Sequence, residues 1–361
     1  MIAKKLGFTG EAIPGGVGPR FILCNHNTDF DFLLLSRVSE EPMDFVATEA
    51  MLRMGLIPRL AATKFKVILH DKGSSGIGTL KGITGRIKLG RSVALFPEGN
   101  RSFDGRTREV SSAIGKIALM TGATIVIYRL TGGYLTTPRW GHGIRRGRMN
   151  GSVVRVLTPE EMSCISAKEL QAIIEEGLYT DAYEEQKKDR VAFKSSKRAE
   201  YLETLLFTCP SCKKIETLSS GGNRLRCSCG FELTLDEYGY LQDKEGRAYS
   251  ATEAFEEQKK LLADMLQGSS DEPLWKDEVT LTRLGTDHSV LEEKSCRLSA
   301  YTGYLMIGDE QLERTDISSV DIVQRNRLSI HESGVDWHYE FTGSMTFNAV
   351  KYLVWFERSF P

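Results

Sequence analysis

Hydrophobic residues in the first 160 positions form short continuous runs that alternate with segments of helical spacing. The runs cover residues 20–25, 43–48, 65–70, 92–99, 124–130 and 151–158. The segments of helical spacing cover residues 30–37, 49–55, 76–90 and 110–121. Strands that alternate with helices predict an α/β domain around a largely parallel sheet. In such a sheet, functional residues collect in the loops beyond the carboxyl ends of the strands.

Beyond residue 160 the pattern changes. Residues 165–206 are charged and amphipathic and predict one or two helices, with Ser166 as an N-cap and Glu169 three positions later. Residues 250–268 predict another helix. From about residue 276 short strand-like runs follow one another, and residues 348–360 return to helical spacing.

These changes divide the chain into five parts. They are an α/β domain at 1–163, a helical connector at 164–206, a compact cysteine-containing unit at 207–243, a helix with a linker at 244–275 and a β-rich domain at 276–361. The expected fold class is α/β, with a mixed sheet and helices followed by these smaller parts. The strands of the last part, closed by one helix, resemble pleckstrin-homology-like modules; a plain structural domain is the alternative.

The net charge of −1 hides an asymmetry. Residues 1–160 hold 23 Lys and Arg against 12 Asp and Glu, whereas the remainder holds 24 against 36. A basic first part favours an anionic partner, which is a phosphorylated substrate, nucleic acid or an acidic lipid surface. A solvated basic face is the alternative.

The sequence also bears on the compartment. No apolar run approaches the roughly 18–20 residues that cross a bilayer, and the N-terminus lacks the apolar core of a signal peptide. Seven cysteines, an odd number, fit a reducing compartment better than a disulfide framework. We therefore expect a cytoplasmic protein that associates peripherally with the inner face of a membrane.

Two segments are candidates for the membrane contact. Residues 50–66 are apolar with interspersed Arg and Lys, which suits a segment lying in the interface; a core helix is the alternative. Residues 139–151 contain four arginines that are suited to phosphate headgroups.

The first polar cluster, NHNTDFD, follows the strand at 20–25. On a continuous helix His26 and Asp31 would lie about 140° apart, so their spacing favours a strand, a loop and a helix start that bring them together. A carboxylate on one ring nitrogen fixes the tautomer, and the other nitrogen then accepts a proton from a hydroxyl. The alternative is a helix N-terminus capped by Asn27, Thr28 or Asp29, with His26 simply hydrogen-bonded.

The second polar cluster, FPEGNRS, follows the strand that begins at residue 92. Pro97 and Gly99 impose a turn, and Glu98 supplies an acceptor. Arg101 carries a planar cation suited to bidentate binding of phosphate. A turn with a surface salt bridge is the alternative.

Together the two clusters resemble a known family. NHNTDFD matches the NHxxxxD block, and FPEGNRS the FPEG(T/N)R(S) block, of the glycerolipid acyltransferases typified by bacterial 1-acylglycerol-3-phosphate acyltransferase. The blocks lie about 70 residues apart, as in that family, and the resemblance covers roughly residues 15–160. It identifies the part at 1–163 as an acyltransferase domain.

The resemblance implies transfer of a fatty acyl group from acyl-CoA or acyl carrier protein to a lysophospholipid or glycerol phosphate. It makes His26 the general base and Asp31 its orienting partner. The substrate-binding residues that it implies are Asn25, Lys72, Glu98, Gly99, Asn100 and Arg101, with Arg101 on the phosphate.

The chain departs from the family pattern in several places. The family's second block usually carries an arginine after an apolar strand, where this chain has Lys72, which binds phosphate as a point charge without the fork geometry. The threonine of the third block is Asn100, and the proline of the fourth block comes late, at Pro138.

Four cysteines form a second candidate site. Cys209 and Cys212 make a CxxC knuckle, and Cys227 and Cys229 follow fourteen residues later as CxC. Two such knuckles present four thiolates to one tetrahedral ion. We expect structural zinc in a zinc-ribbon-like unit, with a redox pair or uncoordinated thiols as alternatives. Four cysteine ligands leave no open position for catalysis.

The leading hypothesis is an O-acyltransferase of phospholipid biosynthesis that converts lysophosphatidic acid to phosphatidic acid. A narrower alternative takes glycerol 3-phosphate as the acceptor. A rival of another class is a non-catalytic zinc-ribbon adaptor or nucleic-acid-binding protein. The rival gives no reason for the two motifs to occur together, so we expect no nucleic-acid partner.

Overall fold

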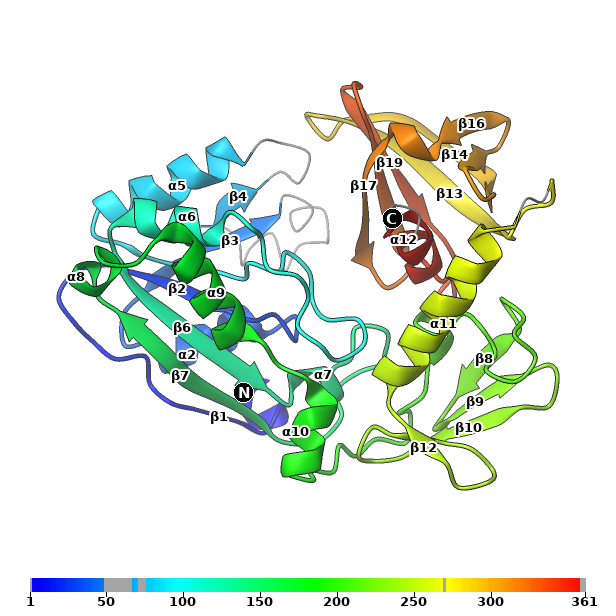
Figure 1. Cartoon of the computed structure of the whole chain (residues 1–361), viewed down its shortest axis with the longest axis horizontal. Helices are drawn as coiled ribbons and strands as arrows, with labels where there is room; N and C mark the ends of the chain where they lie inside the picture. The colour runs from blue at the N-terminus through cyan, green and yellow to red at the C-terminus, as the bar shows by residue number, and fades with distance from the viewer. Residues whose placement is uncertain (1, 49–66, 71–75, 269–270, 358–361) are drawn as a thin grey trace. The chain divides into compact units, whose positions relative to one another are not determined.

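The computed structural model describes residues 2–48, 67–70, 76–268 and 271–357, and it divides into two units. The N-terminal unit comprises residues 1–139 and 143–195, and the C-terminal unit comprises residues 140–142 and 196–361. Figure 1 shows the elements of each unit.

The N-terminal unit is built on a seven-stranded sheet with the order β1-β7-β6-β2-β5-β3-β4. Its strands are β1 Phe8–Gly10, β2 Arg20–Cys24, β3 Met43–Thr48, β4 Ile68–His70, β5 Ser92–Leu95, β6 Thr124–Thr131 and β7 Met149–Leu157. The paired strands run parallel except for β6 and β7, which are antiparallel. The prediction of a mixed, largely parallel sheet is therefore confirmed.

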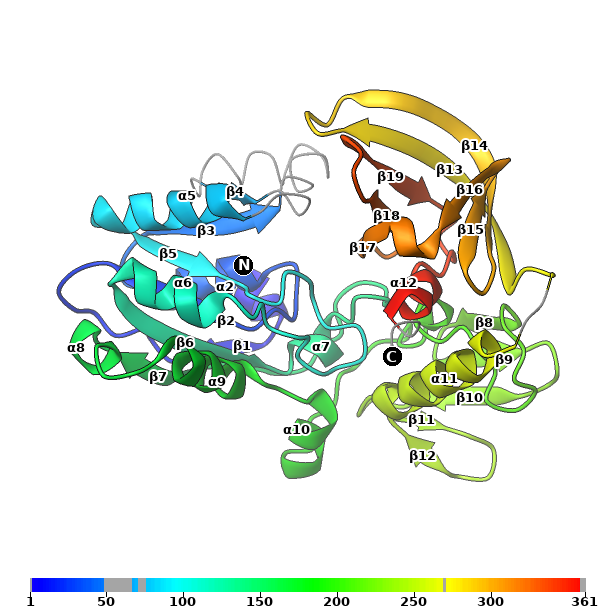
Figure 2. The ribbon, with the colours of Figure 1, turned by 45° about the horizontal axis from the view of Figure 1, so that its top comes forward.

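Helices cover both faces of this sheet. They are α1 Ile2–Lys5, α2 Asp31–Val38, α5 Ile77–Lys88, α6 Ile114–Thr121, α7 Gly133–Thr136, α8 Pro159–Met162, α9 Ala167–Leu178 and α10 Ala182–Lys188. One core cluster joins the sheet to α5, α6 and α9, and a second joins it to α1 and α2 (Figures 1 and 2). All five residues of β2 are buried, because this strand lies between the two clusters.

Helix α9 belongs to the core of the N-terminal unit. Its buried residues Leu170, Ile174 and Leu178 pack in the same cluster as β2 and β6. The helix begins at a capping box between Ser166 and Glu169, as the sequence predicts. The predicted helical segment 165–206 contains two helices, α9 and α10, and most of residues 189–206 are irregular. The five-part division of the chain stays a prediction, since the described packing groups α9 with the sheet.

The described residues of the C-terminal unit form two sheets, two α-helices and two short 3-10 helices. A five-stranded sheet carries the cysteines, in the order β12-β11-β10-β9-β8, and a seven-stranded antiparallel sheet has the order β16-β15-β14-β13-β19-β18-β17. The first sheet consists of β8 Leu218–Gly221, β9 Arg224–Cys227, β10 Glu232–Leu235, β11 Leu241–Gln242 and β12 Ala248–Tyr249. The second consists of β13 Trp275–Gly285, β14 Val290–Ala300, β15 Tyr304–Ile307, β16 Glu310–Glu313, β17 Ile317–Gln324, β18 Arg327–Glu332 and β19 Trp337–Thr342.

Helices α11 Ala251–Leu266 and α12 Val350–Glu357 complete this unit. The predicted β-rich C-terminal region with a single late helix is confirmed, while its likeness to pleckstrin-homology modules stays a prediction. In α12, the ammonium of Lys351 is buried and lies 2.7 Å from Oδ2 of Asp277 on β13. The same ammonium pairs with Glu216, which lies beside the cysteine knuckles. The hydroxyl of Tyr352 donates to Asp277 as well, at 2.7 Å.

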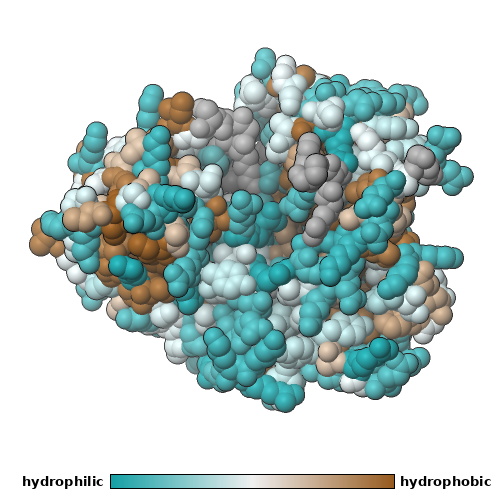
Figure 3. Space-filling model, in the orientation of Figure 1, coloured by the Kyte–Doolittle hydropathy of each residue, from teal (hydrophilic) through white to brown (hydrophobic). Residues whose placement is uncertain are grey.

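The two segments proposed for membrane contact have different outcomes. Residues 50–66 and the predicted helix 49–55 lie outside the described residues. In the segment 139–151, Arg139 and Arg145 are buried, and Arg148 pairs with Asp189. On the face shown in Figure 3, hydrophobic side chains gather over α6 and α9, where Met120 is 53% exposed.

Gly115 sets the close approach of α6 to α9. A β-carbon at this position would overlap the backbone oxygen of Ala167 and lie 2.8 Å from the backbone nitrogen of Gln171. We expect Gly115→Ala to lower the free energy of unfolding by about 1–3 kcal/mol, because backbone cannot yield as a side chain does. Urea denaturation followed by circular dichroism measures this.

Gly85→Ala is the matched control. Gly85 lies inside α5, and no described atom stands within 4 Å of the β-carbon it would gain. Alanine is the better helix former by up to about 1 kcal/mol, so the control should keep or raise stability. Equal losses in the two variants would contradict the packing argument.

Candidate active site

The first motif loop is tied to the sheet by two asparagines. Asn25 donates from Nδ2 to the carbonyl of Leu130 at 2.8 Å and accepts from the amide of Leu130 at 2.7 Å, so its side chain pairs with the backbone of β6. Asn27 donates to the same carbonyl at 2.9 Å. Both side chains are buried. These bonds fix where the loop leaves β2.

Asp31 begins α2 and is fully buried. Its Oδ2 accepts from the amides of Asn27 and Thr28 at 2.7 and 2.8 Å, and its Oδ1 accepts from the hydroxyl of Thr28 at 2.6 Å. The predicted alternative, a helix capped by Asn27, Thr28 or Asp29, is not what occurs, since the N-cap is Phe30 without a side-chain cap. The loop instead directs its own hydrogen-bond donors at the carboxylate of Asp31.

His26 completes this arrangement. Its Nδ1 lies 2.9 Å from Oδ2 of Asp31. Because a carboxylate only accepts, Nδ1 carries the proton, and Nε2 is left with a lone pair. The ring stacks on Phe96 with centroids 4.6 Å apart, and the side chain is 26% exposed. A partly exposed imidazole with an oriented tautomer is the geometry that a general base requires.

Glu98 joins the two motif loops. Its Oε1 accepts from the amide of His26 at 2.7 Å, and its Oε2 accepts from the amide of Arg108 at 2.8 Å. Burial raises the pKa of Glu98 to about 8, against the opposing effect of these two amides. The described partners of the carboxylate are therefore backbone groups, which position His26. The substrate-binding role expected for Glu98 stays a prediction, and a surface salt bridge does not describe it.

Pro97 and Gly99 lie in the turn that the second motif predicts, which is closed by a bond of 3.1 Å from the amide of Gly99 to the carbonyl of Phe96. Gly99 is exposed and adopts a φ of +67°, a conformation that glycine accepts without strain. Asn100 is half-buried. Gly99 and Asn100 connect Glu98, which is buried, to Arg101.

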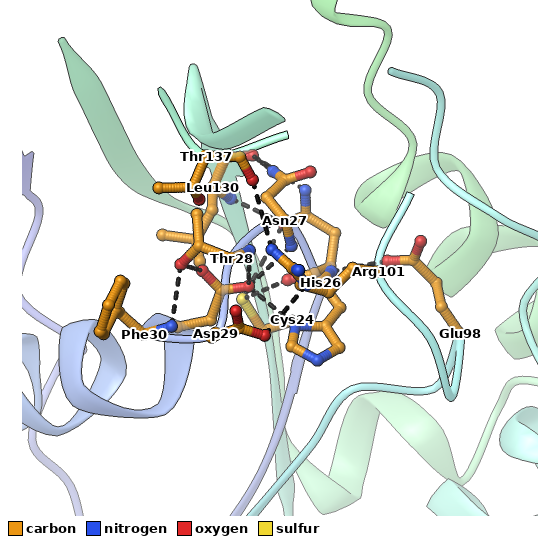
Figure 4. A network of polar contacts seen from close by, with 12 residues as sticks. Cys24, His26, Asn27, Thr28, Asp29, Phe30, Glu98, Arg101, Leu130 and Thr137 are labelled. Carbon is orange, nitrogen blue, oxygen red and sulfur yellow. Dashed lines mark hydrogen bonds and ion pairs between the residues drawn. The ribbon is translucent and has the colours of Figure 1, made fainter. Parts of the chain in front are cut away.

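Arg101 lies beside the first motif loop. Its Nε is 3.1 Å from Oδ1 of Asp29, and its Nη1 donates to the carbonyl of Thr137 at 3.3 Å. The second motif thus brings a cation close to His26, as expected (Figure 4). The spacing of the two motifs does not predict that Arg101 pairs with Asp29.

Further arginines contact side chains near the second motif. The guanidinium groups of Arg108 and Arg139 lie 4.8 and 4.3 Å from the ring centroid of Phe103. Arg106 pairs with the neighbouring Asp104 at 3.0 Å. The sequence shows that arginines are frequent here, but it does not predict that Arg108 and Arg139 pack on the ring of Phe103. Lys72, the remaining expected phosphate ligand, lies outside the described residues.

The domain that holds these loops matches a known family. The family model described as Acyltransferase matches residues 8–129. These residues are an acyltransferase domain. The match contains both motif loops, so the resemblance found in the sequence is confirmed.

Two further comparisons complete the result. The crystal structure of the 1-acyl-sn-glycerophosphate (LPA) acyltransferase PlsC from Thermotoga maritima is similar at 20% identity with a TM-score of 0.42, over 51% of this chain and 74% of that one. A comparison with curated proteins gave no match. Among the described helices, none is both long enough and apolar enough to span a bilayer.

The acyltransferase domain contains one cysteine beside its motif. Cys24 ends β2 and is fully buried, as expected for an inward-facing strand residue. Burial first, and then the charges of Asp31 and Glu98, raise the pKa of the Cys24 thiol well above its usual range. A buried neutral thiol is a poor nucleophile. Cys24 is therefore not a candidate for a catalytic nucleophile in this site.

The four predicted metal ligands come together in the C-terminal unit. Their sulfur atoms all lie within 4.8 Å of one another. Cys209 and Cys229 are 3.8 Å apart at Sγ, and Cys212 and Cys227 are 3.7 Å apart. These separations far exceed the ~2.05 Å of a disulfide. They match the edge of roughly 3.8 Å that a tetrahedron of sulfurs has around zinc at about 2.3 Å.

The pKa of Glu98 generates a prediction about stability. The native carboxyl holds its proton up to about pH 8, whereas the unfolded one releases it near 4.5. Between these values the native state binds more protons, so this group makes the free energy of unfolding fall as pH rises. We expect Glu98→Gln to flatten this part of the profile in denaturation experiments between pH 5 and 8.

Glu109→Gln provides the control, because Glu109 is exposed in the same loop region. It should leave the slope of the profile unchanged. The prediction fails if the Glu98 and Glu109 variants have the same pH dependence.

Proposed function

We propose that the acyltransferase domain transfers a fatty acyl group from a thioester, acyl-CoA or acyl carrier protein, to the free hydroxyl of lysophosphatidic acid, giving phosphatidic acid. The observation that carries this proposal is the His26–Asp31 pair with Arg101 beside it. A base and a phosphate-binding cation are what an acceptor with both a hydroxyl and a phosphate requires.

In the proposed reaction, Nε2 of His26 takes the proton of the acceptor hydroxyl as its oxygen attacks the thioester carbonyl. Asp31 stabilises the imidazolium that forms, as a buried carboxylate on Nδ1 does in other acyl-transfer sites. The tetrahedral intermediate then expels the thiolate of the donor. The thiolate takes the proton from His26, so the products are an ester and a free thiol.

The binding residues follow from the same proposal. Arg101 binds the acceptor's phosphate through its planar fork. Gly99 and Asn100 line the acceptor site in this proposal, and the sequence adds Lys72, which lies outside the described residues, as a further phosphate ligand. Asn25 and Glu98 position His26, because Asn25 bonds to the backbone of Leu130 and Glu98 accepts from the amide of His26. The basic charge of residues 1–160 supports an anionic acceptor.

The acceptor has a rival within the same chemistry. Glycerol 3-phosphate offers the same phosphate to Arg101 and also has a free hydroxyl, so an assay must include both. The rival hypothesis, a non-catalytic zinc-ribbon adaptor, does not explain why the acyltransferase domain contains the His26–Asp31 pair.

We also propose a peripheral position at the inner face of a membrane. Lysophosphatidic acid and phosphatidic acid are amphiphiles whose acyl chains stay in the bilayer. An enzyme that acts on them works at the lipid surface. Sedimentation of the full chain with phosphatidic acid vesicles measures this association.

The central experiment is acyl transfer from labelled acyl-CoA to lysophosphatidic acid by the full chain. We expect His26→Ala to lower the rate by about 10²–10⁴-fold, because the hydroxyl loses its base. Asp31→Asn should lower it as well, since the imidazole loses its orienting charge. Parallel reactions use acyl carrier protein as donor and glycerol 3-phosphate as acceptor.

His142→Ala is the control, because His142 is exposed and lies outside residues 8–129, which the family model matches. It should keep the wild-type rate. If no pair of donor and acceptor reacts, or if the His26 variant is as active as the wild type, the proposed function is wrong.

We propose that Cys209, Cys212, Cys227 and Cys229 hold one structural zinc ion. With four thiolate ligands the ion stabilises the fold and has no open position for a substrate. The amides of Cys212 and Cys229 lie 3.5 Å from the sulfurs of Cys209 and Cys227, where they stabilise thiolates. This arrangement supports metal ligation over isolated thiols.

The metal content of purified protein tests this assignment. We expect one zinc ion per chain in the wild type and its loss in Cys212→Ser, with a lower melting temperature of the C-terminal unit. Cys164→Ser, which changes an exposed cysteine outside the cluster, should keep the metal. Zinc retained in full by the Cys212 variant would contradict the assignment.

A further inference from the structure

The ion pair of Arg101 and Asp29 joins a largely buried cation to an exposed carboxylate, a distribution that Arg20 and Glu41 also show. Nε of Arg101 lies 3.1 Å from Oδ1 of Asp29. The side chain of Arg101 is 14% exposed, whereas that of Asp29 is 69% exposed. The guanidinium of Arg101 is therefore mostly buried, whereas the carboxylate of Asp29 is exposed to solvent.

Two other ion pairs of the N-terminal unit show the opposite distribution. Asp44 is 1% exposed and its partner Arg91 is 32% exposed. Asp104 is 12% exposed and its partner Arg106 is 34% exposed. In these pairs a buried acid is neutralised by an arginine from the surface, which is a structural arrangement. At Arg101 the exposed carboxylate is the partner that can leave.

Arg101 keeps other anchors if Asp29 leaves. Its Nη1 donates to the carbonyl of Thr137 at 3.3 Å. Its own carbonyl accepts from Nη1 of Arg139 at 3.4 Å. The guanidinium therefore keeps its bond to Thr137, and the backbone of Arg101 its bond to Arg139, whether or not the carboxylate is in place. The departure of Asp29 then exposes a cation that is already positioned.

We infer that Asp29 is an internal competitor of the acceptor's phosphate for Arg101. The inference rests on the proposed function, in which Arg101 binds that phosphate. The carboxylate keeps the cation neutralised while the site is empty. A phosphate monoester displaces it because it carries more charge and offers bidentate geometry to the guanidinium. The return of Asp29 to Arg101 then weakens the hold on the product's phosphate.

The inference places Asp29 among the residues that set acceptor affinity. Exposed ion pairs are weak, so the competition is mild and the phosphate still binds. An acceptor without phosphate gains nothing from Arg101 and does not compete. Removal of the carboxylate should therefore strengthen binding of phosphate compounds alone.

The test is titration of the full chain with inorganic phosphate, followed by the NMR signal of the Nε–H group of Arg101. We expect Asp29→Asn to tighten phosphate binding about two- to fivefold, as loss of a weak competing ion pair allows. Glu109→Gln removes the same charge from an exposed position and should change binding by much less. The double variant Arg101→Lys with Asp29→Asn should not show this tighter phosphate binding, and titration calorimetry measures its affinity for phosphate.

The outcomes separate this inference from the proposed function. Unchanged or weaker phosphate binding by the Asp29 variant overturns the inference and makes Asp29 a residue that positions Arg101. Equal gains in the Asp29 and Glu109 variants overturn it too, because a general charge effect explains them. The titration needs no turnover, so an absence of acyl transfer contradicts the proposed function while the titration still decides the role of Asp29. A melting curve of each variant confirms that it is folded.

Discussion

The buried carboxylate of Asp31 is the constraint on which the candidate site depends. An ionised group away from water must be surrounded by donors. Here two backbone amides, the hydroxyl of Thr28 and the ring of His26 supply them. One charge thus sets the shape of the loop, the start of α2 and the tautomer of the imidazole. The asparagine bonds to β6 then fix this loop on the sheet.

The order of strands explains why two motifs 70 residues apart meet. Strands β2 and β5 are parallel neighbours, so their carboxyl ends lie at the same edge of the sheet. The loop after β2 carries His26, and the loop after β5 carries Glu98. The carboxylate of Glu98 then accepts from the backbone of both loops. The distance between base and cation is therefore a property of the sheet as well as of the side chains.

The sequence was sufficient to predict the parts that depend on periodicity and residue type. Runs of hydrophobic residues predicted six of the strands. The predicted strand, loop and helix start predicted that His26 and Asp31 approach each other. It did not predict the pairing of Asp29 with Arg101 or the inward direction of Glu98. These depend on loop torsions and on which backbone amides face inward, for which residue types carry no signal. Helix α9 was expected in a connector, because its charged outer face hides the stripe of Leu170, Ile174 and Leu178 that packs on the sheet.

The buried ammonium of Lys351 has a consequence for which parts of the C-terminal unit evolve together. It pairs with Asp277 of one sheet and with Glu216 next to the cysteines that precede it. Loss of one member of a buried charged group leaves the others without compensation. A shortened or recombined gene that kept β13 without α12, or α12 without the cysteine part, would leave Asp277 or Lys351 with fewer partners. Selection should therefore transmit the two sheets of this unit together, as one evolutionary module.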